Sequence, residues 1–152
     1  MLLDASASTR RHGALPRAKG LLAQLFENAY RQRARLAVLH ATGRQPRWLW
    51  QGQKASPAVH RWLTELGAGG GTPLIEALQQ AGSWLERRQR QKPAEQQRML
   101  ILTDGRLKDW PALELLGCPA LLVDIEGGPI RLGRAKKLAE ALGAEYRVIS
   151  EL

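Results

Sequence analysis

The chain has 152 residues, of which 23 are basic and 14 acidic, so its formal net charge at neutral pH is +9. This length favours a single domain, residues 1–152, built around one hydrophobic core. No apolar run approaches the roughly 18 residues of a membrane-spanning helix, and the lone Cys118 excludes an intrachain disulfide, so we expect a cytoplasmic protein without a membrane partner.

Strand-like and helix-like segments alternate along the chain. Ala18, Leu22 and Phe26, for example, recur at the spacing of one helical face. The same patterns predict strands at residues 1–4, 36–39, 47–50, 99–102, 120–123 and 146–149. They predict helices at residues 14–31, 57–66, 73–92, 111–116 and 132–142.

Continuous apolar strands interleaved with amphipathic helices are typical of a doubly wound α/β fold, a mainly parallel sheet with helices on both faces. The alternating segment at residues 47–50 suits an edge strand. Ligands of such sheets bind beyond the carboxyl ends of the strands, where the strand order reverses. Asp4 ends the first predicted strand and Asp104 follows the fourth, so both carboxylates should lie at that edge.

Three separated fragments carry oxygen ligands where apolar runs give way to small residues. They are Asp4-Ala5-Ser6-Ala7-Ser8, Gly69-Gly70-Gly71-Thr72-Pro73 and Leu102-Thr103-Asp104-Gly105. Each fragment alone reads as a turn or a helix entry. Together they offer two carboxylates and three hydroxyls, which suits a hard cation such as Mg²⁺ or Mn²⁺. The predicted metal ligands are Asp4, Ser6, Ser8, Thr72 and Asp104.

The order of these fragments resembles the metal-ion-dependent adhesion site of von Willebrand factor A domains, whose pattern is D-x-S-x-S, then a Thr, then an Asp. The resemblance implies that the Ser6, Ser8 and Thr72 hydroxyls ligate directly, while Asp4 and Asp104 often act through water. It also implies that an acidic residue of a partner protein completes the coordination. The implied role is metal-dependent binding of a partner protein, with no catalytic residue.

Further segments resemble the C-terminal domain of the D subunit of magnesium chelatases and cobaltochelatases. They are Gly69–Leu74, Leu100–Arg106, Val123–Gly128, Leu138–Gly143 and Ile149–Leu152. The resemblance implies a noncatalytic module that couples an AAA+ ATPase subunit to the large catalytic subunit, which inserts Mg²⁺ or Co²⁺ into a tetrapyrrole. The family's full subunit has an ATPase-like domain and a linker before this module. Either the true start lies upstream, or a stand-alone module relies on separate ATPase subunits.

Two other functions remain open at this stage. One is a von Willebrand A adaptor for a different AAA+ ATPase. The other is a small metal-dependent phosphohydrolase, which needs an acid/base group near the ion, and His12 is the candidate. A P-loop is excluded because its G-K-[ST] signature is absent.

The basic residues are dispersed over three predicted helices, around one helix end at residues 31–35, around another at 87–92 and on a third helix at 134–137. The helix dipole favours basic side chains in last turns, so solvated helix ends explain them. A surface for an acidic protein partner is the alternative. No basic stripe with interleaved aromatic residues occurs, so we expect no nucleic acid partner.

Overall fold

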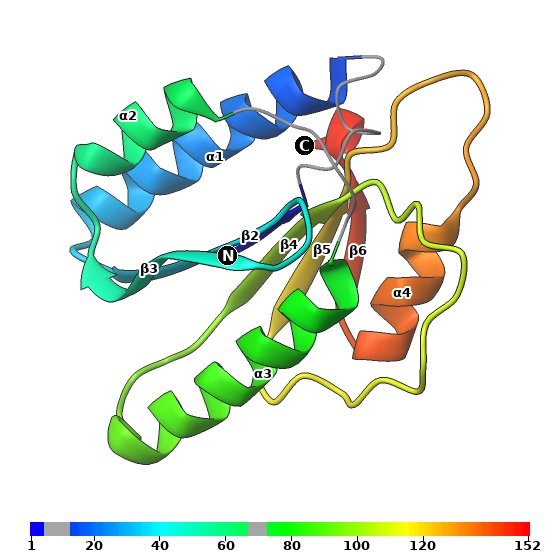
Figure 1. The fold of residues 1–152 in the computed structure, drawn as a ribbon. Coiled ribbons are helices and arrows are strands. Elements are labelled where there is room, and N and C mark those ends of the chain that lie inside the picture. Colours follow the sequence, from blue (N-terminus) through cyan, green and yellow to red (C-terminus); the bar gives the residue numbers. More distant parts are fainter. Residues whose placement is uncertain (5–12, 67–72) are drawn as a thin grey trace.

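The computed structural model describes residues 1–4, 13–66 and 73–152, and these residues form a sheet with helices packed on both of its faces (Figure 1). The strands are β1 (Leu2–Asp4), β2 (Arg35–Ala41), β3 (Arg47–Lys54), β4 (Met99–Thr103), β5 (Ala120–Asp124) and β6 (Glu145–Val148). The helices are α1 (Ala14–Arg31), α2 (Ala58–Glu65), α3 (Leu74–Gln91), α4 (Arg134–Leu142) and the 3₁₀ helix η2 (Ile149–Glu151).

The strand order is β3-β2-β1-β4-β5-β6, and every neighbouring pair is parallel except β2 and β3. The edge strand predicted at residues 47–50 is β3, and the predicted doubly wound α/β class is confirmed. The chain order reverses direction between β1 and β4. Their carboxyl ends form the switch point at which sheets of this kind bind ligands.

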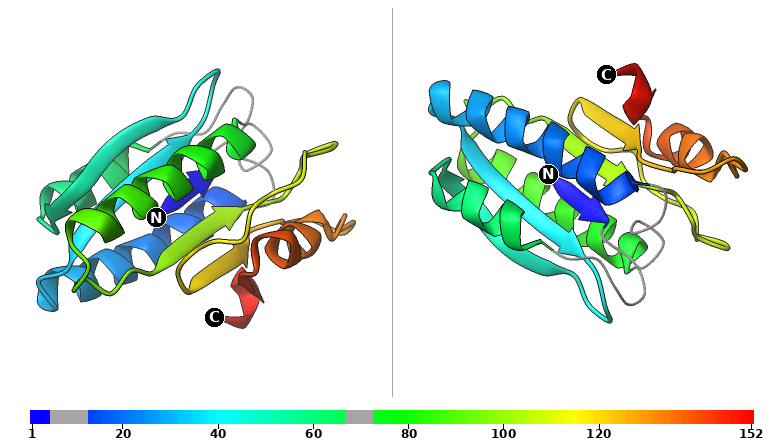
Figure 2. Two further views of the ribbon diagram at one scale, coloured as in Figure 1. Left: turned by 90° about the horizontal axis from the view of Figure 1, so that it is seen from below. Right: turned by 90° about the horizontal axis from the view of Figure 1, so that it is seen from above.

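Each face of the sheet is covered by its own hydrophobic cluster. Leu3 of β1 belongs to the cluster beneath α1 and α2, with Phe26 of α1 fully buried in it. Leu2, one residue earlier, belongs to the cluster beneath α3 and α4. Figure 2 shows the sheet between these two helix layers. Side chains of a central strand alternate between two apolar layers, which explains why the sequence shows continuous apolar runs.

One predicted helix is wrong. Residues 111–116 are not helical, and the backbone N–H of Leu116 instead donates to the carbonyl of Leu142 at the end of α4. Six residues are too few to offset the cost of starting a helix. Leu113 nevertheless packs on the core beneath α3 and α4. Leu116 packs there too, whereas Leu115 is 72% exposed, so packing on the core accounts for only part of the apolar pattern.

Several boundaries differ from the prediction. The strands predicted at residues 36–39 and 47–50 are longer, Arg35–Ala41 and Arg47–Lys54. The last helix begins at Arg134, because Gly133 adopts a left-handed conformation with φ 66° and ends the preceding loop. Leu132, predicted inside this helix, is outside it and exposed. Ile149 leaves the last strand and starts η2. Among the described residues, no helix combines the length and the apolar character that crossing a bilayer requires.

Candidate functional site

The structure brings two of the five predicted metal ligands to one place. Asp4 is the last residue of β1 and Asp104 directly follows β4, and these strands are paired neighbours with Leu3 opposite Leu102. Both carboxylates are buried. The other three predicted ligands, Ser6, Ser8 and Thr72, lie outside the described residues.

Thr103, the last residue of β4, orients the Asp4 carboxylate. Its hydroxyl donates to Asp4 Oδ2 at 2.7 Å and accepts the backbone N–H of Gly105 at 3.0 Å. The donated proton fixes one carboxylate oxygen, and the accepted bond fixes the turn that follows Asp104. Sequence reasoning missed this role. The available signal was a polar residue at the end of the apolar run Leu100-Ile101-Leu102.

The two oxygens of Asp104 have different surroundings. Oδ1 accepts the backbone N–H of Arg106 at 3.1 Å, in an Asx-type turn. Oδ2 is buried and has no hydrogen-bond partner among the described residues, although Asp104 is only 3% exposed. A buried charged oxygen without a partner is costly. A cation bound at Oδ2 would remove that cost, so this carboxylate fits the metal that the sequence predicts.

Gly105 holds the chain after Asp104 against helix α4. Its φ is 65°, and a Cβ atom there would lie 2.5 Å from the backbone nitrogen of Ala135. Only glycine fits both the left-handed conformation and this close approach. The position of Asp104 is therefore set by contact with a helix that lies far away in sequence.

Asp124 is a third buried carboxylate at the same edge, and both of its oxygens accept hydrogen bonds. It accepts the backbone N–H of Glu126 at 2.8 Å, the Arg131 guanidinium at 3.1 Å and the Tyr146 hydroxyl at 2.6 Å. Burial and the adjacent carboxylate raise the pKa of Tyr146 to about 12, so the phenol stays protonated as a donor. These hydrogen bonds indicate a structural role for Asp124.

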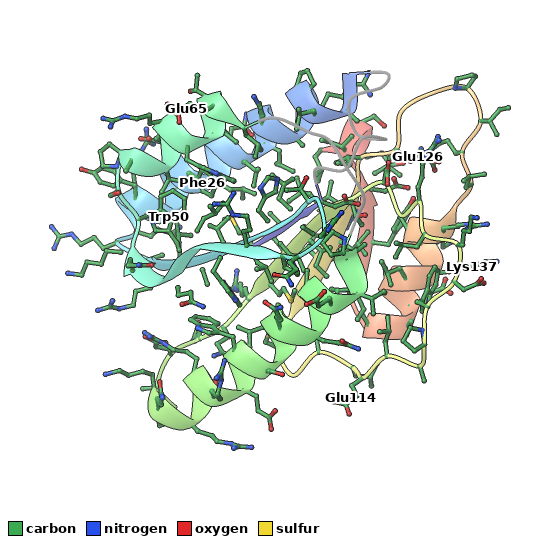
Figure 3. The ribbon with its side chains drawn as sticks, in the orientation of Figure 1. Phe26, Trp50, Glu65, Glu114, Glu126 and Lys137 are labelled. Carbon is green, nitrogen blue, oxygen red and sulfur yellow. The ribbon has the colours of Figure 1, made fainter. Side chains whose placement is uncertain are left out.

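Glu126 organises the loop between β5 and α4. Its two carboxylate oxygens accept the backbone N–H of Leu132 at 3.2 and 3.0 Å, and Oε1 lies 3.4 Å from Arg106 Nη2. Figure 3 shows Glu126 at the carboxyl end of the sheet, at the root of this loop. Glu126 thus connects this loop to Arg106, whose backbone N–H donates to Asp104.

The histidines in the described residues are not placed to assist Asp4. Successive side chains of a strand point to opposite faces, and Leu3 belongs to the core beneath α1 and α2, so Asp4 points to the other face. His40 packs edge-on against Trp62 of α2, with ring centroids 6.2 Å apart. Burial and the charge of Arg47 lower the pKa of His40, so it is neutral at physiological pH. His12, the predicted acid/base candidate, lies outside the described residues.

A cation at this edge of the sheet would have few charged protein ligands. Among residues 1–4, 13–66 and 73–152, no group of three or more His, Cys, Asp or Glu side chains is placed to hold a metal. Two neighbouring carboxylates remain at the switch point. A site built there has to take further oxygen ligands from hydroxyls, water or a partner.

Comparison with known proteins gives one family and several relatives. A family model described as the von Willebrand factor type A domain matches residues 1–106. The magnesium-chelatase 67 kDa subunits of Chlorobaculum parvum and Chlorobaculum tepidum are 30% identical over 95% of this chain and 27% of their own length. An uncharacterised protein of Mycobacterium tuberculosis is 29% identical over 99% of this chain and 26% of its own. The chain thus spans about a quarter of the length of these relatives.

Solved structures share the fold at low identity. BatB of Bacteroides thetaiotaomicron superposes with a TM-score of 0.71 at 14% identity, covering 97% of this chain and 87% of BatB. An aerotolerance-related membrane protein of Bacteroides fragilis gives 0.69 at 14% identity, with 95% and 87% covered. The SpRpn10 VWA domain gives 0.62 at 13% identity, with 97% and 84% covered. These likenesses establish the architecture alone.

Proposed function

Because the chain belongs to the von Willebrand factor type A family, we propose that its carboxyl edge holds a divalent cation and, through it, an acidic residue of a partner protein. Domains of this family generally bind other proteins and are not catalytic. The proposed cation is Mg²⁺ or Mn²⁺, and its bound charge would attract the partner's carboxylate. The proposed ligands are Asp4, Ser6, Ser8, Thr72 and Asp104.

The observation that carries the proposal is the Asp104 carboxylate. Its Oδ2 atom is buried without a hydrogen-bond partner among the described residues, beside Asp4 at the switch point. A native protein tolerates such an oxygen chiefly where function requires it. Thr103 and Gly105 hold the two carboxylates in place, which supports a preorganised site as part of the proposal.

We further propose that this module belongs to a metal chelatase that inserts magnesium or cobalt into a tetrapyrrole. It would couple an AAA+ ATPase subunit to the large catalytic subunit. The support is the 30% identity to two magnesium-chelatase subunits over nearly the whole chain. A von Willebrand A adaptor for another AAA+ ATPase is the alternative that the family match alone would also allow.

Titration calorimetry with Mn²⁺ and Mg²⁺ tests the metal site. Wild-type protein should bind one ion, and Asp4→Ala and Asp104→Ala should each abolish binding. Asp109→Ala is the matched control, because Asp109 is an exposed aspartate on the same loop as Asp104. Equal binding in Asp104→Ala and the control would refute the site.

Surface plasmon resonance with the AAA+ chelatase subunit tests the partner. The complex should form with Mg²⁺ and dissociate in EDTA, and Thr72→Ala should speed dissociation. Purified protein should show no phosphatase turnover with Mg²⁺. A complex that persists in EDTA would make the cation irrelevant to recognition, and binding to a different AAA+ ATPase alone would favour the adaptor.

A further inference from the structure

A cleft of about 410 Å³ lies at the amino ends of the parallel strands, at the opposite edge of the sheet from the candidate metal site. Arg35 and Met99, at which β2 and β4 begin, both line it, whereas neither Asp4 nor Asp104 does. Figure 1 shows the end of α3 and the start of β4 at this edge, at the lower left. Small-molecule sites typically have volumes of about 300–1,000 Å³, so the cleft is large enough to hold a ligand.

One wall of this cleft is apolar and partly aromatic. Trp48 of β3 and Trp84 of α3 line it, and their ring centroids lie 5.7 Å apart with the planes inclined by 44°. Both tryptophans are partly buried. Leu39, Ala81 and Leu85 extend the wall. A surface of this kind can cover an apolar ring and remove it from water.

The Arg88 guanidinium lies beside these rings because Gly52 of β3 has no side chain. A Cβ atom at Gly52 would lie 2.9 Å from Arg88 Nη1 and 3.5 Å from the Trp84 ring. Arg88 Nε and Nη2 donate to the two carboxylate oxygens of Glu95, at 2.7 and 2.5 Å. This two-point contact fixes the plane of the guanidinium. Nη1 has no acceptor among the described residues, so its N–H groups remain available to a ligand.

Positive charge exceeds negative charge around the cleft. Among the described residues that line it, the charged side chains are Arg35, Arg88, Arg98 and Glu95. The hydrogen bond from Arg88, together with nearby positive charges, lowers the pKa of Glu95, so Arg88 and Glu95 form an ion pair that neutralises both. Arg35 donates to the carbonyl of Gly52 at 2.9 Å, and the exposed Arg98 has no ion pair or hydrogen bond within the described ranges. Two guanidinium charges therefore stay without a counter-charge.

We propose that this cleft is a binding site for a small aromatic carboxylate. The aromatic body packs on Trp48 and Trp84, and the carboxylate accepts hydrogen bonds from Arg88 Nη1 and Arg98. Guanidinium groups are well suited to a carboxylate, because their N–H groups match its two oxygens. Burial of the ring adds affinity that charge alone does not supply. The inference does not depend on the proposed metal site, which lies at the other edge of the sheet.

The test is a titration of the full chain with 2-naphthoate, followed by the side-chain N–H signals of its five tryptophans in nuclear magnetic resonance spectra. The signals of Trp48 and Trp84 should shift and saturate. Trp50 and Trp62 are internal controls, because they pack on the other face of the sheet, where Figure 3 shows Trp50 near Phe26. EDTA in the buffer keeps the probe's carboxylate from binding a cation. Absence of saturable shifts at Trp48 and Trp84, or equal shifts of every tryptophan, would overturn the site.

A neutral probe and a neutral variant test the role of charge. Naphthylmethanol has the same rings with a hydroxyl in place of the carboxylate, and it should bind about tenfold more weakly than naphthoate. Arg98→Gln should weaken naphthoate binding several-fold and leave naphthylmethanol binding unchanged. Arg61→Gln, on an exposed arginine of α2, is the control with the same change in net charge, and it should bind like wild type. Equal affinities for the two probes, or equal naphthoate affinities for the two variants, would refute recognition of an anion.

A larger side chain in the apolar wall tests where the ring binds. Ala81 is only 7% exposed and lines the cleft, so Ala81→Leu fills space that the probe needs and should weaken naphthoate binding about tenfold. Unshifted Trp50 and Trp62 signals would show that this variant is folded, and wild-type naphthoate affinity in it would overturn the placement of the ring. Asp104→Ala should bind naphthoate like wild type, and Ala81→Leu should bind Mn²⁺ like wild type. Mn²⁺ binding without naphthoate binding would overturn this inference alone, and the reverse result would overturn the proposed metal site alone.

Discussion

The ends of β4 and β5 lie side by side, with Thr103 opposite Asp124, and both present a buried aspartate. Asp124 receives donors from a backbone amide, an arginine and a tyrosine. Asp104 has one oxygen with a single backbone donor and one without a donor among the described residues. Identical side chains one strand apart therefore have opposite surroundings.

This difference separates a structural carboxylate from one available for a ligand. A buried carboxylate that accepts several donors stabilises the folded state and cannot readily take a cation without losing them. A buried oxygen without a donor destabilises the folded state until something positive binds it. Both aspartates lie at the end of a buried strand and are buried themselves, so only their hydrogen-bond partners distinguish the two residues.

The largest expected effect is the loss of Asp124. Asp124→Ala leaves the Tyr146 hydroxyl and the Glu126 amide without their acceptor, so it should lower the free energy of unfolding by about 3 kcal/mol. Tyr146→Phe removes one donor only and should cost about 1 kcal/mol. Urea denaturation measures both. Equal stability of Asp124→Ala and wild type would contradict the structural role.

Two glycines near these strand ends sharpen the comparison. Gly105 and Gly133 have nearly equal φ values, 65° and 66°, but only Gly105 would bring a Cβ atom into Ala135. Gly133→Ala should therefore show the conformational penalty alone, about 1 kcal/mol. Gly105→Ala adds a backbone clash and should lower the free energy of unfolding by about 2–3 kcal/mol in total. It should also weaken Mn²⁺ binding, because Asp104 precedes the displaced turn, whereas Gly133→Ala should bind Mn²⁺ normally.

The fold was accessible from sequence because buried parallel strands and amphipathic helices leave different apolar patterns. The pattern was ambiguous at residues 111–116, where apolar residues pack on the core without forming a helix. The start of α4 was predicted too early, at Leu132, because apolar spacing does not show that Gly133 adopts a left-handed backbone conformation. Periodicity therefore located the elements, and local backbone conformation set their ends.

The carboxylates of the candidate site were also accessible from sequence, since Asp4 and Asp104 follow apolar runs at strand ends. The hydrogen bonds that hold the carboxylates at these strand ends were not accessible from sequence. Thr103 is 99 residues from Asp4, and Tyr146 is 22 residues from Asp124, so these hydrogen bonds depend on the tertiary fold. The roles of Ser6, Ser8 and Thr72 stay predictions.

A smaller effect of opposite sign is expected at Asp104. Asp104→Asn keeps an acceptor for the Arg106 N–H but replaces the unpartnered charged oxygen with a neutral amide. In EDTA this variant should be more stable than wild type by about 1 kcal/mol, because a neutral group is cheaper to bury. Added Mn²⁺ should raise the melting temperature of wild type only. A variant less stable than wild type in EDTA would show that Asp104 has hydrogen bonds like those of Asp124.

The smallest expected effect concerns His40, whose Nε2 is the other buried polar side-chain atom without a hydrogen-bond partner among the described residues. Burial and Arg47 lower its pKa in the folded protein, so the unfolded chain binds a proton more readily. Stability should therefore be insensitive to His40 above its unfolded pKa of about 6.5 and should fall as the pH drops below it, by up to about 1.4 kcal/mol per pH unit.

The variant His40→Leu isolates this contribution. It should retain more of its neutral-pH stability than wild type on going from pH 7 to pH 5.5, by up to about 1 kcal/mol, in urea denaturation at each pH. His60→Leu is the control, because the His60 side chain is partly exposed and its Nε2 atom lies 3.8 Å from the Glu27 carboxylate. Identical pH profiles for wild type and His40→Leu would mean that His40 gains a partner when protonated. Mn²⁺ affinity at pH 7 should be the same in both proteins, because His40 packs on Trp62 at the face of the sheet opposite Asp4. A buried polar atom without a partner therefore indicates a cation site only where, as at Asp104, it is negatively charged and lies at the switch point.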